Sequence, residues 1–236
     1  MDVKKLESLI LKENICVTDS FYDNLSIFHD MLIQKNKVLN LTAITDENEM
    51  ILKHYLDSLM GLKYNVINEN IKVADVGCGA GFPSLVLKFA MPKTEFTLID
   101  ALKKRLDFID EVINKTKIKG IKTLHLRAED AGRNETRESF DVVVSRAVAN
   151  LNVLLELCAP LLKVGGKFIA YKGAKGKEEL ENAKRALEKL DLKVIKCDEF
   201  YLSEDDDKRC IIIFEKLKTT NKIYPRQFAK IKKSPL

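Results

Sequence analysis

The sequence contains few of the residues that build metal sites and disulfide frameworks. Its 236 residues include no tryptophan, three histidines and five cysteines. The cysteines are dispersed and form no Cys-x-x-Cys pair: Cys16, Cys78, Cys158, Cys197 and Cys210. An odd, scattered set is typical of free thiols in a reducing compartment, and the histidines have no cysteine or aspartate partners at ligand spacing. We therefore expect neither disulfides nor a metal site.

Long apolar segments are also absent. The longest stretch without a charged residue is residues 76–87, which is too short to span a bilayer. The first residues, MDVKKLESLILKEN, are charged throughout and lack the apolar block of a signal peptide. These absences predict a cytoplasmic protein without membrane association.

Positive charge is concentrated at the C-terminus. The formal net charge is +5, and residues 216–236 hold seven of the 40 basic residues and none of the 35 acidic ones. The rest of the chain therefore carries 33 basic and 35 acidic residues. Such a segment favours an arm for an anionic partner, above all nucleic acid, with a solvated terminus as the alternative.

The first third of the chain has helical spacing of apolar residues. The segments VKKLESLILKE, FYDNLSIFHDMLIQKN and DENEMILKHYLDSLMGL predict three helices. We expect Asp19 to cap the second helix, Thr45 or Asp46 to cap the third, and Gly61 to close it. Residues 1–62 are thus predicted to form a helical extension.

From residue 71 onward, short β-branched or apolar runs alternate with helix-like stretches. The runs KVADV, EFTLID, KTLHL, FDVVVS and KFIAY predict parallel strands with helices on both faces. LKVIKCDEF and RCIIIFEK follow with only a loop between them and predict an antiparallel edge hairpin. We expect an α/β, Rossmann-like domain over residues 63–215, with a mostly parallel seven-stranded sheet, followed by a basic tail over residues 216–236.

The stretch VADVGCGAGFPSLVL places a glycine loop between the first strand and its helix. Gly77, Gly79 and Gly81 follow the strand, and Pro83 suits the first helical turn. The spacing differs from dinucleotide-binding turns, and no lysine follows in phosphate-loop form. Asp75, just before the loop, disfavours a pyrophosphate and favours a ligand with a cationic amino group. S-adenosylmethionine has such a group and no phosphate.

Two further strand ends match the same ligand. EFTLID ends at Asp100, whose carboxylate can accept ribose hydroxyls and can also cap the next helix. The third strand ends in RAED, where Ala128 would lie against an adenine face, with Glu129 or Asp130 near its amine. Glycine loop, Asp100 and third-strand acid together predict an S-adenosylmethionine-dependent methyltransferase.

The chain also resembles the RsmG (GidB) family of bacterial methyltransferases. The matching segments are NLTAIT (40–45), HYLDSL (54–59), DVGCGAGFP (75–83), DALKKR (100–105), RAED (127–130), FDVVVSRAVANL (140–151), PLLKVGGKFIAYKG (160–173) and YPRQFAKIKKSPL (224–236). The resemblance implies methylation of guanine N7 in 16S ribosomal RNA near the decoding site, on naked RNA or in the small ribosomal subunit.

The resemblance also implies cofactor contacts. Positions that match the family's cofactor-contacting residues are Gly77, Phe82, Ala128, Glu129 and Arg146. To these we add the neighbouring loop and strand-end residues Asp75, Gly79, Gly81, Asp100 and Ala101. Ser84 stands where many members have glycine, and we expect it to be tolerated at the start of a helix.

The expected chemistry needs no general base, because guanine N7 has an in-plane lone pair and no proton. The fourth strand ends in Ser145-Arg146-Ala147, without the Asp/Asn-Pro-Pro-aromatic motif of exocyclic-amine methyltransferases. We interpret Cys78 as a filler of the loop and Cys158 as a core residue, so we expect no covalent enzyme intermediate. The enzyme's contribution is then mainly positioning.

Four residues are predicted to bind the substrate. Arg146, at the end of the fourth strand, could pair with the methionine carboxylate, an RNA phosphate or the guanine plane. Lys172, Arg226 and His54 are the other candidates, and Asp57 shares a helix face with His54. We expect the tail to touch RNA phosphate and, since it follows the last strand, to be dispensable for cofactor binding. We also expect a monomer.

Three other functions compete with this interpretation. A methyltransferase for small molecules or proteins is disfavoured by the basic tail and by the lack of a metal site. A non-catalytic RNA-binding protein is disfavoured by the intact glycine loop, Asp100 and Glu129. A nicotinamide-dependent dehydrogenase is disfavoured by the glycine spacing.

Overall fold

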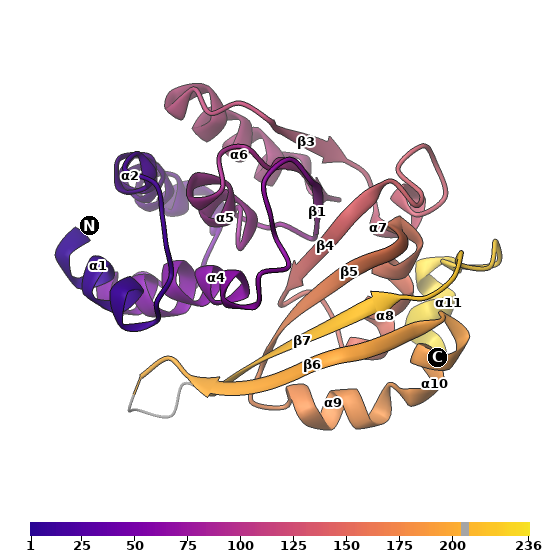
Figure 1. The fold of residues 1–236 in the computed structure, drawn as a ribbon. Helices are drawn as coiled ribbons and strands as arrows, with labels where there is room; N and C mark the ends of the chain where they lie inside the picture. Colours follow the sequence, from indigo (N-terminus) through magenta and orange to yellow (C-terminus); the bar gives the residue numbers. More distant parts are fainter. Residues whose placement is uncertain (204–207) are drawn as a thin grey trace.

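The computed structural model describes residues 1–203 and 208–236. Within them one seven-stranded sheet has the order β3-β2-β1-β4-β5-β7-β6 (Figure 1). Its strands are β1 (Lys72–Val76), β2 (Glu95–Asp100), β3 (Ile121–His125), β4 (Phe140–Arg146), β5 (Leu162–Gly173), β6 (Leu192–Tyr201) and β7 (Lys208–Lys216). β1 to β5 are parallel, and β7 runs antiparallel to both β5 and β6. The predicted fold class is confirmed.

The strand order reverses in the middle of the sheet. The chain builds from β1 through β2 to β3 on one side, then returns to β4 beside β1 and continues to β5 on the other side. Asp75 in β1 is paired with Val144 in β4 and with Leu98 in β2. This reversal brings the carboxyl ends of β1 and β4 together, which is where open α/β sheets bind ligands.

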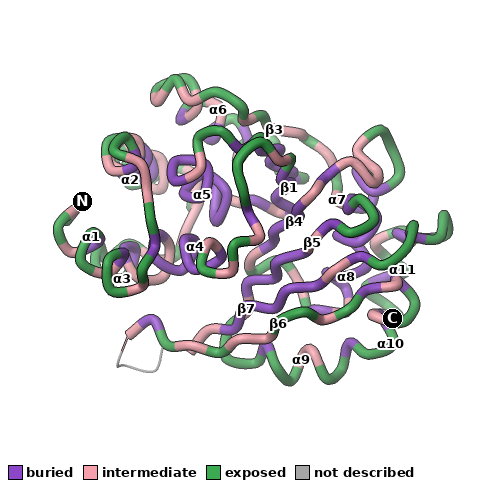
Figure 2. Tube along the Cα trace, in the orientation of Figure 1, coloured by how far each residue is buried: buried purple, intermediate pink, exposed green. Residues whose placement is uncertain are grey.

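The last two strands form the predicted hairpin, and their burial reflects their positions. β7 lies between β5 and β6, and its central residues Ile211, Ile212, Ile213 and Phe214 are buried. β6 lies at the edge of the sheet and is mostly exposed or half-buried (Figure 2). The apolar run therefore belongs to the strand that has a neighbour on each side.

Helices cover both faces of the sheet (Figure 1). They are α1 (Val3–Lys12), α2 (Phe21–Leu39), α3 (Glu47–Met50), the π-helix η1 (Ile51–Leu56), α4 (Asp57–Leu59), the 3₁₀ turn η2 (Met60–Tyr64), α5 (Ser84–Ala90), α6 (Lys103–Thr116), α7 (Ala128–Ala131), α8 (Leu151–Cys158), the 3₁₀ turn η3 (Ala159–Leu161), α9 (Gly176–Asn182), α10 (Lys184–Lys189) and α11 (Phe228–Lys233). Residues from α1 to α6 share one hydrophobic cluster with one face of the sheet, and α8 and α10 share a second cluster with the other face.

The three N-terminal helices are present, with differences at their ends. Asp46 caps the third, its side chain accepting a hydrogen bond from the Glu49 N–H at 3.0 Å. The expected Asp19 cap is wrong, because the turn continues one residue further and α2 begins after Ser20. The third helix does not close at Gly61 but runs on through η2 to Asn65, whose φ of 52° is left-handed.

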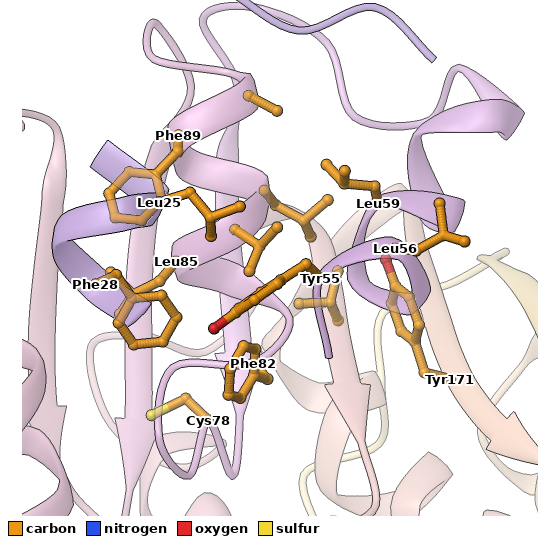
Figure 3. Packing of buried hydrophobic residues seen from close by; sticks show 14 of the residues in the cluster. Leu25, Phe28, Tyr55, Leu56, Leu59, Cys78, Phe82, Leu85, Phe89 and Tyr171 are labelled. Carbon is orange, nitrogen blue, oxygen red and sulfur yellow. The ribbon is translucent and has the colours of Figure 1, made fainter. Parts of the chain in front are cut away.

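The helical extension packs directly onto the glycine loop. Phe28 of α2 lies 5.3 Å from Phe82, measured between ring centroids, and Tyr55 of η1 lies 6.1 Å from the same ring. Figure 3 shows these aromatic rings gathered around Phe82, beside Cys78. The extension therefore shares its core with the sheet and helps to position the loop. The bounds of the three parts, 1–62, 63–215 and 216–236, stay a prediction.

The C-terminal segment is folded against α8. Its main ion pair joins Arg226 to Glu156, which is fully buried in α8. Arg226 Nε donates to Glu156 Oε1 at 2.8 Å and Nη2 to Oε2 at 2.6 Å. The tail's carbonyls are held as well: Tyr224 O accepts from Arg137, and Pro225 O accepts from Arg133. A buried carboxylate needs such partners, so the pair ties the tail to the domain.

We predict that Arg226→Ala lowers the free energy of unfolding by about 3 kcal/mol, because it leaves the buried Glu156 carboxylate unpaired. Urea denaturation followed by circular dichroism measures this. Lys222→Ala is the matched control, since Lys222 is an exposed cation of the same segment. The control should change the free energy by less than about 0.5 kcal/mol. Equal effects of the two variants would mean that Arg226 is only a solvated charge.

Candidate active site

A cavity of about 320 Å³ opens at the carboxyl ends of β1 to β4. It is lined by strand ends and by the loops and helices that follow them: Val76, Gly77, Ile99, Asp100, Ala101, Leu102, Arg105, Leu126, Arg127, Ala128, Glu129, Ala147, Val148, Leu157 and Phe228. We call it the first cavity. It occupies the place at which the strand order reverses, as the sequence predicted for the ligand.

The glycine loop closes one side of the first cavity. Gly77, Gly79 and Gly81 have φ values of 72°, 57° and 103°, a left-handed region that side chains rarely adopt. A Cβ on Gly77 would lie 2.5 Å from Val148 Cγ2, whereas a Cβ on Gly79 would meet no atom within 4 Å. Gly79 therefore has open space beside its backbone, whereas Gly77 allows the loop after β4 to pack closely through Val148.

Asp100 connects the glycine loop to the end of β2. Its Oδ2 accepts from the Gly79 N–H at 3.0 Å, and its Oδ1 accepts from the Leu102 N–H at 2.8 Å. Arg105 Nη1 lies 3.5 Å from Oδ2. The carboxylate is nearly buried, but it lines the cavity and its oxygens retain further lone pairs for hydroxyl donors. Asp100 therefore braces the loop and the following helix while still facing the ligand space.

Asp75 and Ser84 are buried beneath the loop. Both side chains are fully buried, and neither Asp75 carboxylate oxygen nor the Ser84 hydroxyl makes a hydrogen bond with a described residue. Burial raises the pKa of Asp75 to about 7, although the nearby Ser84 and the positive charge of Arg146 act in the opposite direction. A carboxylate held this way is stabilised strongly by a cation or a hydrogen-bond donor from a ligand.

The corner after β3 supplies the opposite wall of the first cavity. Arg127 Nε donates to Glu129 Oε1 at 2.6 Å, so the guanidinium holds a carboxylate that is itself almost buried. Ala128 lies between them and lines the cavity with its small side chain. The wall therefore combines an apolar surface with an oriented acceptor, which suits a flat base that carries an amino group.

A second cavity of about 380 Å³ lies beside the first. Its walls come from the third N-terminal helix run and the loop before it, from the ends of β4 and β5, from the start of β7 and from α9. The lining residues are Ile44, Lys53, His54, Asp57, Arg146, Ala147, Tyr171, Lys172, Gly173, Glu179 and Arg209. Ala147 lines both cavities and has a left-handed φ of 57°, which is uncommon for a residue other than glycine. The two cavities therefore meet at the turn that follows β4.

Arg146 is held at this junction by a buried ion pair. Its Nη1 donates to Asp57 Oδ2 at 2.8 Å, and the Ser58 hydroxyl and the Lys53 carbonyl lie 3.3 and 3.2 Å from the same nitrogen. The guanidinium carbon also lies 5.1 Å from the centroid of the Phe82 ring. The acceptors come from η1 and α4, so the helical extension sets the orientation of a β4 side chain.

His54 is a neutral part of the second cavity. Its ring stacks on Phe82, with centroids 4.4 Å apart, and its Nε2 lies 2.7 Å from the Thr42 hydroxyl. Burial and the positive charge of Arg146 lower its pKa to about 3. His54 thus fills and orients the site at neutral pH without carrying charge.

Lys172 stabilises the loop between β4 and α8. Its Nζ forms an ion pair with Glu179 at 2.7 Å and donates to the Ala149 carbonyl at 2.8 Å. Glu179 also accepts from the N–H of Leu151, the first residue of α8. These bonds fix the loop that carries Ala147 between the cavities.

The structure divides the predicted site residues into three groups. Gly77, Asp100, Ala101, Ala128 and Glu129 line the first cavity, and His54, Arg146 and Lys172 line the second. Asp75 lies in β1, and Gly79, Gly81 and Phe82 lie in the loop after it; none of the four lines either cavity. Arg226 lies in neither cavity, because Glu156 holds its guanidinium.

Several residues that line the first cavity were not among the predicted site residues. Phe228, in the C-terminal tail, lines the first cavity. The tail reaches this wall because α11 packs on α8. That the tail is dispensable for cofactor binding stays a prediction. The basic segment has two aromatic residues, Tyr224 and Phe228, and nothing in their spacing marks Phe228 as part of a cavity wall. Val148 follows β4 by two residues but was not singled out, and Leu157 reaches the wall from α8, where no local pattern marks it.

The fold is similar to that of solved S-adenosylmethionine-dependent methyltransferases. The structure of a SAM-dependent methyltransferase from Aquifex aeolicus matches 75% of this chain and 97% of its own, with a TM-score of 0.58 and 17% identity. M. jannaschii TYW2 in complex with AdoMet matches 74% of this chain and 80% of its own, with a TM-score of 0.57 and 17% identity. These similarities concern the fold.

Sequence comparison identifies the family. The family described as rRNA small subunit methyltransferase G matches residues 22–207. Ribosomal RNA small subunit methyltransferase G from Staphylococcus aureus strains JH9 and Newman is 41% identical over 236 residues, covering the whole chain and 99% of the relative. The chain belongs to this family, and the predicted family, enzyme class and cofactor are confirmed.

The residues present fit S-adenosylmethionine. The unpaired buried carboxylate of Asp75 suits a ligand with an ammonium group, and the open backbone at Gly79 suits close approach. Asp100 and Glu129 offer acceptors for ribose hydroxyls and for an adenine amine.

No described helix is long and apolar enough to cross a membrane.

We predict that Asp75→Asn stabilises the ligand-free protein at pH 8 but not at pH 4. The folded-state pKa of about 7 exceeds the ordinary value of 3.8, so the folded state binds more protons between these values. Its stability therefore falls as pH rises through that window, and the asparagine variant lacks this loss. The expected gain at pH 8 is on the order of 1–4 kcal/mol by urea denaturation.

The same variant should bind S-adenosylmethionine more weakly in calorimetry, because the partner for the ammonium group is neutral. Asp107→Asn, at an exposed ion pair on α6, is the control. It should change neither the pH dependence of the free energy of unfolding nor the affinity for S-adenosylmethionine. An equal stability difference at pH 4 and pH 8 would show that Asp75 does not titrate as proposed.

Proposed function

We propose that this chain transfers the methyl group of S-adenosylmethionine to N7 of a guanine in 16S ribosomal RNA, near the decoding site. Family membership supports an RNA substrate, since the relatives are named for ribosomal RNA of the small subunit. The observation that carries the proposal is the pair of cavities that meet at Ala147.

The paired cavities suit a donor and an acceptor held side by side. When bound, S-adenosylmethionine supplies an electrophilic methyl group. The first cavity offers Asp100 and Glu129 to its nucleoside, while the second offers Arg146, Tyr171 and Lys172 to an incoming base. Holding two reactants in one orientation can contribute several orders of magnitude in rate, so positioning supplies most of the catalysis.

The second cavity favours a ring nitrogen over an exocyclic amine. His54 is neutral at pH 7 and its Nε2 is engaged by Thr42, while Asp57 is paired with Arg146. Neither is placed as a general base. Guanine N7 has a lone pair and no proton to remove, so it needs none, and the transfer proceeds in line without one.

The cysteines support a mechanism without a covalent enzyme intermediate. Cys78 is buried in the glycine loop, and burial together with the negative charges of Asp75 and Asp100 raises the pKa of its thiol well above the ordinary value. Cys158 is buried in α8, and its pKa is raised by the same cause. Neither is therefore available as a thiolate nucleophile.

Arg146 is the residue that we assign to the acceptor. Its Nη1 is committed to Asp57, whereas its Nε and Nη2 donate to no described residue. Guanidinium N–H groups match the O6 edge of guanine or a phosphate. The ion pair with Asp57 would fix the free edge of the guanidinium beside the shared wall of the two cavities.

The exposed lysines of the tail support binding to RNA phosphate. Lys222, Lys230, Lys232 and Lys233 are exposed, and none forms an ion pair with a described carboxylate. Phosphate contacts of this kind weaken steeply with salt.

We also propose that the protein acts in the cytoplasm, where its ribosomal RNA substrate resides, and that it is a monomer.

Mapping methylated nucleotides by mass spectrometry tests the function directly. Ribosomal RNA from cells lacking the protein should miss one N7-methylguanine near the decoding site, and the purified chain should restore it. Naked 16S RNA and assembled small subunits should be assayed in parallel. Restoration of a methyl group on an exocyclic amine or a carbon would refute the N7 assignment.

We predict that Arg146→Lys lowers the methylation rate at saturating RNA and cofactor by about 100-fold, because a lysine cannot hold both Asp57 and the acceptor. Arg185→Lys, at an exposed site on α10, is the control and should keep the wild-type rate. Single-turnover assays at several pH values should show no ionisation of a catalytic base between about pH 6 and 9. A wild-type rate for Arg146→Lys would remove Arg146 from the acceptor site.

A further inference from the structure

The C-terminal segment is built into the wall of the first cavity. Phe228, the first residue of α11, lines this cavity together with Ala128 and Leu157. The same residues belong to a small hydrophobic cluster around Val153, Leu157 and Ile231, to which Ala128 and Phe228 contribute as partly buried members. The aromatic ring is therefore part of an apolar surface that is open to the ligand space.

Two contacts fix the ring beside the corner that follows β3. The guanidinium carbon of Arg127 lies 5.4 Å from the centroid of the Phe228 ring. The same guanidinium donates to Glu129, which was predicted to approach the adenine amine. Phe228, Arg127 and Glu129 thus form one continuous wall, although Phe228 follows the other two by about a hundred residues in the chain.

The backbone on both sides of Phe228 is anchored. Arg226 is held by Glu156, and its Nη2 also donates to the Ser234 carbonyl at 3.1 Å, on the far side of α11. Ile231, one turn after Phe228, is fully buried against α8. A ring held by anchors on each side is preorganised for a ligand.

We propose that Phe228 packs against the adenine base of S-adenosylmethionine, so that residues 224–236 form a wall of the cofactor site. This inference rests on the proposed function, because it takes S-adenosylmethionine as the ligand of the first cavity. Aromatic side chains pack against bases. Phe228 lines the cavity together with Ala128 and Glu129, so its ring can contact a base held there. The methionine end would lie elsewhere, toward Asp75, so Phe228 acts on the nucleoside alone.

Calorimetric titration with S-adenosylhomocysteine and with adenosine tests the contact. Phe228→Ala should weaken both affinities by the same factor, about five- to 150-fold, since both ligands carry the base. Ile223→Ala is the matched control, because Ile223 is a large apolar residue of the same segment that is 62% exposed, and it should leave both affinities unchanged. Unchanged affinities in Phe228→Ala, or a loss for S-adenosylhomocysteine but not for adenosine, would overturn the proposal.

Fluorescence gives a second test that does not depend on loss of affinity. The chain has no tryptophan, so Phe228→Trp introduces a single indole at the wall. Adenosine should change its emission with the same dissociation constant that calorimetry gives, while methionine should not. Ile223→Trp should not respond to either. An emission from Phe228→Trp that stays constant at saturating adenosine would overturn the proposal, whereas absence of binding to the wild-type protein would instead refute the proposed function.

Discussion

The buried ion pair between Arg146 and Asp57 is the interaction on which the arrangement of the site depends. It joins the end of a central strand to the helix run of the N-terminal extension, 89 residues earlier in the chain. Burying two charges is costly unless their remaining donors and acceptors find partners. Here the Ser58 hydroxyl and the Lys53 carbonyl also face the guanidinium, and the Phe82 ring lies against it. The pair therefore fixes both the extension and the reacting edge of the sheet.

The same constraint explains why the helical extension belongs to the site. Phe82 lies at the end of the glycine loop and is surrounded by His54, Tyr55 and Phe28 from the extension. These contacts restrict how far the loop can move, and the loop in turn carries Gly79 and its hydrogen bond to Asp100. The extension thus positions the glycine loop beside the first cavity through its contacts with Phe82. Its η1 segment also supplies residues that line the second cavity.

Not all of the basic residues counted in the tail remain available to bind RNA in the folded protein. Its seven basic residues predicted an arm for RNA, and four exposed lysines remain available for that task. Arg226, however, neutralises Glu156, and Lys216 is fully buried, with its Nζ 2.6 Å from Glu138. Burial lowers the pKa of Lys216, although Glu138 acts against this shift. Part of the basic excess therefore stabilises the protein, because the buried Glu156 carboxylate requires a cation and the buried Lys216 ammonium requires an acceptor.

The strand ends were predictable from the sequence, because a parallel sheet brings residues that follow its strands to one edge. Asp75, the three glycines, Asp100 and Glu129 could therefore be assigned to one region from their positions along the chain. The cap of the third helix was predicted as Thr45 or Asp46 because it depends on a hydrogen bond only three residues away, and the structure shows Asp46.

Only the tertiary structure decided which distant side chains complete the site. Phe228 reaches the first cavity through the packing of α11 on α8, and Asp57 reaches Arg146 through the packing of the extension on the sheet. Such contacts depend on the sum of many weak apolar interactions over the whole core, which no local pattern records. The sequence by itself determined the class of fold and the edge of the sheet at which the ligand site lies. The tertiary structure decided which distant residues line the two cavities.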